Sequence, residues 1–178
     1  CVLDAPAARV EVQQGDDSEC CRLPAGANGE WSRMAGRDGK IIDLRWIPAP
    51  ESRTRDMFYL TGLNEGWCAL TNRNLGFGVG MAWDVEMFPV LWVWQELCGS
   101  SGYPWFSETY AMGLEPFTAY STESPGGLAR VIEAGQERRL AAGAQISTGL
   151  RMVCYQAVEE QAVERISQEG VVFYKTMR

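Results

Sequence analysis

Hydrophobic and polar residues alternate along most of this chain in short runs with the two-residue period of a β-strand. Runs of this kind predict strands that turn one face toward a core. Turn-forming residues separate them, for example Asp38-Gly39 and Asn72-Arg73-Asn74. The candidate strands are ARVEVQ, KIIDLRWI, DMFYLTGL, GWCALTNRN, GFGVGMAWD, FPVLWVWQEL, TYAMGLEPFT, AQISTGLRMVCYQA and VVFYKTMR. This spacing predicts an all-β fold, an antiparallel β-sandwich in which the runs between residues 56 and 97 form a meander.

Two segments have the periodicity of a helix. Residues 124–140 carry apolar side chains on one helical face, and two internal glycines limit them to a short helix. Residues 157–170 space Val158, Ala162 and Ile166 as a helix does, and they end in a glycine. The prediction is therefore a β-sandwich with one or two short helices.

Composition and charge narrow the class of protein. The 178 residues are 46% hydrophobic and 22% charged, which suits a single domain over residues 1–178. No apolar run is long enough to span a membrane, so no membrane partner is expected. The net charge of −7 argues against a nucleic-acid partner, because phosphate binding depends on clustered Lys and Arg.

Cysteine and histidine usage restricts the available chemistry. Cys68, Cys98 and Cys154 lie in apolar strand-like runs, which is typical of buried thiols in a reducing, cytoplasmic compartment. The adjacent Cys20 and Cys21 lack the partner spacing of a zinc site, so no metal is predicted. The chain has no histidine, which excludes histidine-based catalysis by its own residues.

The run FPVLWVWQE, residues 88–96, is the strongest candidate for a binding surface. Strand alternation places Trp92 and Trp94 on one face, and Leu91 and Val93 on the other. One interpretation is a central strand buried on both faces. The other is a sugar platform, because pyranose rings stack on flat aromatics while amides and carboxylates bind their hydroxyls. The candidate substrate contacts are Trp83, Asp84, Trp92, Trp94, Gln95, Glu96 and Trp105.

Two of these predictions concern single side chains. Alternation turns Gln95 away from the two indoles. Glu115, in the run YAMGLEPFT, shares its strand face with Gly113 and Phe117, so it is a candidate general base on a partly apolar surface. The competing interpretation is an edge-strand glutamate in water.

Residues 31–156 resemble the C-terminal part of aldose 1-epimerase-like proteins of the galactose mutarotase superfamily. The resemblance lies in GRDGKIIDLRWIPAP, LNEGWCALTN, GFGVGMAWDVEMFPVLWVWQE, GYPWFSETYAMGLEPFT and LAAGAQISTGLRM, above all in the FPxLWxWQE and LEP segments. It implies a β supersandwich with a sugar cleft, a monosaccharide or sugar-derivative substrate, no cofactor, and Glu115 as the base. Asp56 corresponds weakly to a sugar-binding aspartate of the family.

The resemblance also implies a missing partner for the base. In the superfamily an N-terminal half supplies the acid, a histidine, and this chain contains neither. We therefore expect an incomplete C-terminal portion of a longer protein, with a divergent branch without the acid as the other interpretation.

Two rival functions remain open on the sequence. A lectin-type binding module would use the same aromatic platform without an acid. Glycoside hydrolysis or lyase chemistry would need two carboxylates about 5 to 10 Å apart, which Glu115 with Glu96 or Asp84 would supply.

Overall fold

The computed structural model describes residues 1–15, 18–122 and 126–176, and nearly all of its regular structure is strand. The first half contains β1 Val2–Asp4, β2 Arg9–Val12, β3 Asn28–Glu30, β4 Arg33–Ala35, β5 Ile41–Asp43, the 3-10 turn η1 Pro50–Ser52, β6 Thr54–Thr61, β7 Trp67–Asn72 and β8 Phe77–Trp83. The second half contains β9 Val90–Leu97, β10 Tyr110–Phe117, the helix α1 Gly127–Glu133, β11 Leu150–Gln156, β12 Gln161–Ile166 and β13 Val172–Thr176.

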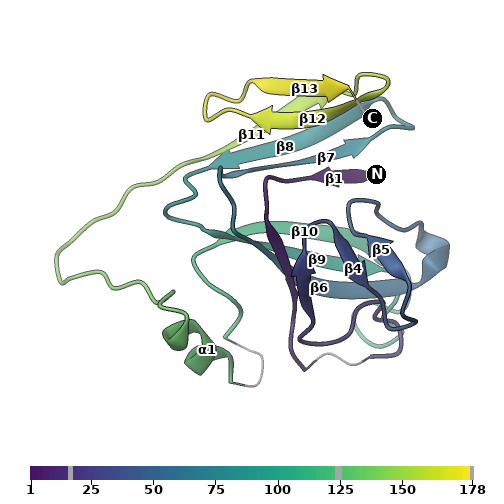
Figure 1. Cartoon of the computed structure of the whole chain (residues 1–178), viewed down its shortest axis with the longest axis horizontal. Coiled ribbons are helices and arrows are strands. Elements are labelled where there is room, and N and C mark those ends of the chain that lie inside the picture. Colours follow the sequence, from purple (N-terminus) through teal and green to yellow (C-terminus); the bar gives the residue numbers. More distant parts are fainter. Residues whose placement is uncertain (16–17, 123–125, 177–178) are drawn as a thin grey trace.

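Two antiparallel sheets pack face to face, which confirms the predicted all-β sandwich (Figure 1). The first, here called the β9 sheet, has the strand order β10-β9-β6-β2-β3. The second, the β8 sheet, has the order β1-β7-β8-β11. The hairpins β4–β5 and β12–β13 are separate two-stranded sheets, and β12–β13 lies over the outer side of the β8 sheet.

The main core fills the space between the two sheets. Every second residue of the central strands points inward, as the alternating pattern predicts. The buried inward-facing side chains include Leu3, Val10, Phe58, Leu60, Cys68, Trp83, Leu91 and Val93. The inner face of the β9 sheet belongs to this core, so the side chains on its outer face are available for other contacts.

The predicted meander is wrong in its connectivity. β6 pairs with β9, whereas β7 and β8, which lie between them in sequence, pair with each other in the opposite sheet. The chain therefore leaves the β9 sheet, forms a hairpin across the core, and returns. Turn spacing reports where strands end, but it carries no information on which sheet each strand joins.

The predicted helix over residues 157–170 is also wrong. This segment contains β12, which pairs with β13 and buries Val163 and Ile166 against the β8 sheet. The register shifts between Val163 and Arg165, so one extra residue is accommodated there. The spacing of Val158, Ala162 and Ile166 predicted the helix, but these residues do not share one buried face, because Val158 lies before β12 and is 42% exposed. Gly80 leaves room for Ile166, whose Cδ1 lies 2.1 Å from where a Cβ would be.

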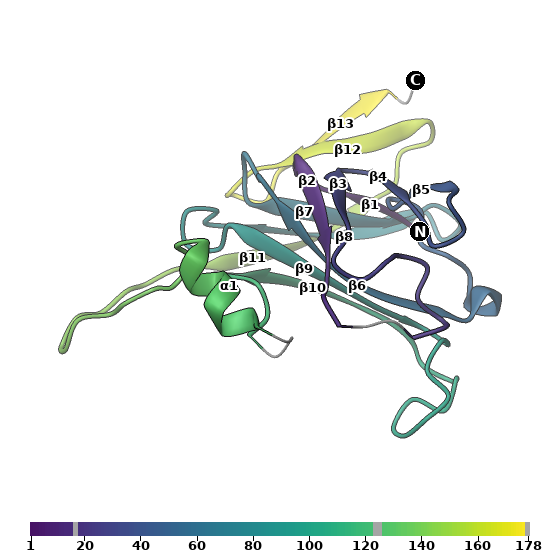
Figure 2. The same ribbon diagram turned by 60° about the horizontal axis from the view of Figure 1, so that its bottom comes forward.

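The short helix predicted within 124–140 is confirmed as α1, although residues 124 and 125 lie outside the described ranges. After it the chain follows a long path to β11, and residues 137–152 are exposed (Figures 1 and 2). The final predicted strand is confirmed as β13, and residues 177 and 178 lie outside the described ranges. Within the described ranges, no helix has the length and apolar character needed to cross a membrane.

Burial was predicted for the thiols of Cys68, Cys98 and Cys154; the prediction is confirmed for Cys68 and wrong for Cys154. Burial raises the pKa of the Cys68 thiol to about 12, and Cys98 is partly buried. Cys154 is exposed, because β11 is an edge strand of the β8 sheet. All six cysteines are free thiols.

Candidate functional site

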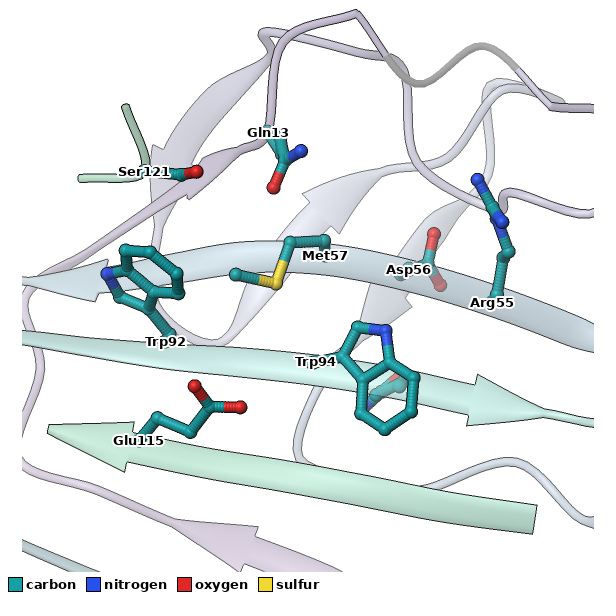
Figure 3. Close-up of a pocket in the computed structure, with 9 residues that line it drawn as sticks. Gln13, Arg55, Asp56, Met57, Trp92, Trp94, Glu115 and Ser121 are labelled. Carbon is teal, nitrogen blue, oxygen red and sulfur yellow. The ribbon is translucent and has the colours of Figure 1, made fainter. Parts of the chain in front are cut away.

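A cavity of about 290 Å³ opens on the outer face of the β9 sheet (Figure 3). Strands β6, β9 and β10 form its floor, and the segments around Gln13 and Ser121 rise beside it. The residues that line it are Gln13, Arg55, Asp56, Met57, Trp92, Trp94, Gln95, Glu115 and Ser121. Two indoles, two carboxylates, a guanidinium, a thioether and three neutral polar groups therefore share one small hollow.

The two indoles of β9 lie on the open face and not in the core. Trp92 and Trp94 are partly exposed, whereas Leu91 and Val93 between them are buried on the inner side. The interpretation of FPVLWVWQE as a strand buried on both faces is therefore wrong, because the face that carries Trp92 and Trp94 is open.

Neighbouring groups hold each indole in one position. The Trp92 Nε1 donates a hydrogen bond of 2.7 Å to the Ala119 carbonyl oxygen, and its ring stacks on Phe117 at 3.9 Å between centroids. Trp94 packs against Trp105, with 5.3 Å between ring centroids. These contacts make the platform rigid, because few rotamers remain available to either side chain.

Glu115 lies directly beside this platform. In the register of β9 and β10, Glu115 pairs with Trp92, and Gly113 pairs with Trp94. The Glu115 side chain folds back along its strand over Gly113, where a Cβ would lie 2.4 Å from Glu115 Oε1. Figure 3 shows the carboxylate on β10, beside the strand that carries the two indoles. The predicted grouping of this acid with Trp92 and Trp94 is therefore observed.

Asp56 and Gln95 touch the cavity but belong to a buried network around Arg22. Asp56 Oδ2 accepts a 2.6 Å bond from Arg22 Nε, and Asp56 Oδ1 accepts bonds from the backbone N–H groups of Arg22 and Leu23. Gln95 Oε1 accepts from Arg22 Nη2 at 2.8 Å. Gln95 also turns away from the indoles, as alternation predicts.

The Asp56 carboxylate is therefore occupied within the protein. Burial raises the pKa of Asp56, and the Arg22 guanidinium opposes that rise. We interpret its role as fastening residues 22 and 23 to the sheet, which differs from the sugar contact predicted for it.

Glu96 also has a different position from the one predicted. It is 1% exposed, and its Oε1 accepts the backbone N–H groups of Gly99 and Ser100 at 2.9 Å each. Its Oε2 accepts a 2.5 Å bond from the Ser100 hydroxyl, which in turn accepts a bond from Arg55. This carboxylate holds the loop after β9 and is not directed at a ligand.

Trp83 and Asp84 lie outside the cavity, which corrects their predicted role as substrate contacts. Trp83 is fully buried between the sheets, and its Nε1 donates to the Phe88 carbonyl oxygen at 3.0 Å. Asp84 accepts backbone N–H bonds from Glu86 and Met87 in the turn between β8 and β9. Both residues belong to the opposite sheet or its turn, because β8 does not join the β9 sheet.

Four cavity residues were not anticipated from the sequence. Arg55 and Met57 stand on β6 opposite Glu96 and Trp94, so the pairing of β6 with β9 would have identified them. Gln13 and Ser121 come from irregular segments and carry no comparable signal.

The described residues contain no group of three or more His, Cys, Asp or Glu side chains placed to hold a metal ion. The groups that line the cavity are aromatic faces, the carboxylates of Asp56 and Glu115, the Arg55 guanidinium and neutral side chains. Comparison with family models, curated proteins and solved structures found no match.

Proposed function

We propose that the cavity on the β9 sheet binds a monosaccharide or a simple sugar derivative. The observation that carries this proposal is that the Glu115 carboxylate and the two rigid indoles line one cavity, with Glu115 paired to Trp92 across neighbouring strands. The apolar face of a pyranose stacks on an indole, and its hydroxyls need polar partners at the ring edge. The volume of about 290 Å³ lies at the small end of ligand pockets, about 300 to 1,000 Å³, which suits one sugar ring.

The reaction that this arrangement supports best is interconversion of anomers, as in the aldose 1-epimerase-like proteins that the sequence resembles. Glu115 would accept the proton of the anomeric hydroxyl while the bond between C1 and the ring oxygen breaks. The ring oxygen takes up a proton from solvent water, and C1 then turns about its bond to C2. On reclosure Glu115 returns its proton to the new anomeric oxygen, and the proton of the ring-closing hydroxyl returns to water. No cofactor enters this scheme. General-base assistance of this kind is typically worth about 10² to 10⁴ in rate.

A non-catalytic sugar-binding module is the second candidate, and the lining of the cavity favours it. Among the described residues that line it, none is a histidine, lysine or tyrosine to protonate the ring oxygen. The alternative of hydrolysis or lyase chemistry loses its second acid, because Glu96 is committed to its loop and Asp84 lies in a turn of the other sheet.

Two measurements separate these candidates. Saturation-transfer NMR on glucose and galactose tests binding, and polarimetry tests whether the protein accelerates their mutarotation. Trp94→Ala should abolish binding of either sugar, because it removes one of the two stacking surfaces. Binding without acceleration would favour the module, and no Trp94-dependent binding of either sugar would refute the proposal.

Glu115→Gln tests the base. This variant keeps the size and polarity of the side chain, so we expect sugar binding within a few-fold of wild type and a fall in mutarotation of about 10² to 10⁴. Glu133→Gln, an exposed glutamate on α1, is the matched control and should change neither. Full activity in Glu115→Gln would remove this residue from the mechanism.

A further inference from the structure

The loop between β9 and β10, residues 98–109, continues the aromatic surface of the cavity. Trp105, in the middle of this loop, packs against Trp94, which lines the cavity. Two further aromatic side chains, Tyr103 and Phe106, lie on the same loop with 5.9 Å between their ring centroids. In Figure 2 the loop projects beyond the ends of β9 and β10 at the lower right. One ring pair therefore joins the cavity to this loop, and a second ring pair lies on the loop itself.

The tip of this loop exposes its aromatic rings to solvent. Tyr103 is 86% exposed and Phe106 is 58% exposed. Residues 98–107 include three serines besides the aromatic side chains and no charged residue, and Glu108 follows them. Large exposed rings that gather on one loop usually mark a contact with a ligand or partner. Uncharged hydroxyls beside flat rings suit a neutral, hydroxyl-rich ligand.

The loop is held in a defined shape. The backbone N–H groups of Trp105 and Phe106 both donate to the Gly102 carbonyl oxygen, and Ser107 N donates to Ser100 O at 2.7 Å. Phe106 and Ser107 have left-handed backbone conformations, with φ of 48° and 57°. Such conformations are unfavourable for residues with side chains, so the surrounding contacts must maintain them.

The base of the loop is joined to the cavity wall through Ser100. Glu96 accepts the Ser100 hydroxyl, and Arg55, which lines the cavity, donates to the same oxygen at 3.2 Å. The position of the tip is therefore tied to the floor of the cavity. A rigid loop loses little conformational entropy when a ligand covers it.

We infer that Tyr103, Trp105 and Phe106 form an outer subsite for a second sugar unit, so that the preferred ligand is a neutral oligosaccharide whose terminal ring occupies the cavity. This inference rests on the proposed sugar-binding function and specifies its ligand class. Stable protein interfaces bury about 1,200 to 2,000 Å² in total, whereas this tip presents only two largely exposed rings. One further sugar ring matches that surface better than a protein partner does.

The test compares ligand length by titration calorimetry. Glucose and galactose would be measured against their di-, tri- and tetrasaccharides, linked 1,4 in either anomeric form. We expect the preferred series to gain about tenfold in affinity from one unit to two, equivalent to about 1.4 kcal/mol. The double variant Tyr103→Ala/Phe106→Ala should lose this gain and keep its affinity for the single sugar. The tip is exposed, so the variant should fold normally.

Matched controls separate this inference from the proposed function. Phe77→Ala removes a 46% exposed ring from β8, in the other sheet, and should leave every affinity unchanged. The outer subsite would be refuted if mono- and disaccharide bound with equal affinity, or if the double variant kept the higher affinity for the disaccharide. Either result would leave the proposed sugar binding in the cavity intact. Failure of every sugar to bind would overturn both. Self-association that the double variant abolishes, without a gain for oligosaccharides, would identify the tip as a protein contact instead.

Discussion

Gly113→Ala is the most direct test of whether the position of the Glu115 carboxylate matters. The new Cβ would lie 2.4 Å from Glu115 Oε1, whereas ordinary contact begins at 3.4 Å. The oxygen must therefore move by about 1 Å, a displacement that can cost about 10²-fold in rate when it affects a reacting group. The next two atoms, Glu115 Cδ at 3.4 Å and Trp94 Cβ at 3.6 Å, would be at ordinary contact distance and need not move.

This substitution should leave the fold intact. The displaced atom is the end of a flexible side chain, and replacing a glycine by alanine restricts the unfolded chain, which can stabilise a protein by about 0.4 to 1 kcal/mol. We expect an unchanged or slightly higher melting temperature in calorimetry. In the same variant, sugar affinity should fall about tenfold, and any mutarotation should fall about 10²-fold.

Gly149→Ala is the matched control for Gly113→Ala. Nothing lies within 4 Å of the Cβ that would be added at Gly149, which stands just before β11. It should therefore behave as wild type in both assays. The reasoning is refuted if Gly113→Ala keeps wild-type affinity and rate, because the carboxylate would then have moved without consequence.

Two further predictions concern stability. Asp56→Ala leaves the Arg22 guanidinium, 15% exposed, without its ion-pair partner, so urea unfolding should show a loss of about 3 kcal/mol, toward the low end for a buried pair. Asp43→Ala breaks the solvent-exposed pair with Arg45 and should cost at most about 1 kcal/mol; equal losses would contradict a structural role for Asp56. Burial and the 2.6 Å hydrogen bond to Glu11 raise the pKa of Tyr120 to about 12 from 10.0. The folded protein holds the proton of the Tyr120 hydroxyl more tightly than the unfolded chain does. The contribution of this hydroxyl to the free energy of unfolding is therefore complete below pH 10 and declines as the pH rises toward about 12. The difference in unfolding free energy between wild type and Tyr120→Phe should therefore shrink over that interval, and a constant difference would show that this proton is not linked to folding.

The sequence determined most of the longer strands and which side chains share a face of each central strand. Alternation placed Trp92, Trp94 and Glu115 outward from their strands and Leu91 and Val93 inward, and the structure agrees. This information is local, because the period of two follows from the geometry of an extended backbone whatever its surroundings. Alternation therefore placed Trp92 and Trp94 on one face of β9, but it could not show that no other part of the chain covers this face.

The tertiary structure alone decided which residues share the cavity. Strand pairing over long sequence separations brings β6 against β9 and moves β8 to the other sheet, so Arg55 and Met57 join the site and Trp83 leaves it. Pairing with β13 makes residues 161–166 a strand despite their helical spacing, and buried partners divert Asp56 and Glu96 from a ligand to the protein itself. These strand pairings and buried ion pairs depend on contacts between segments that are distant in sequence, and a local pattern of residue types cannot predict such contacts.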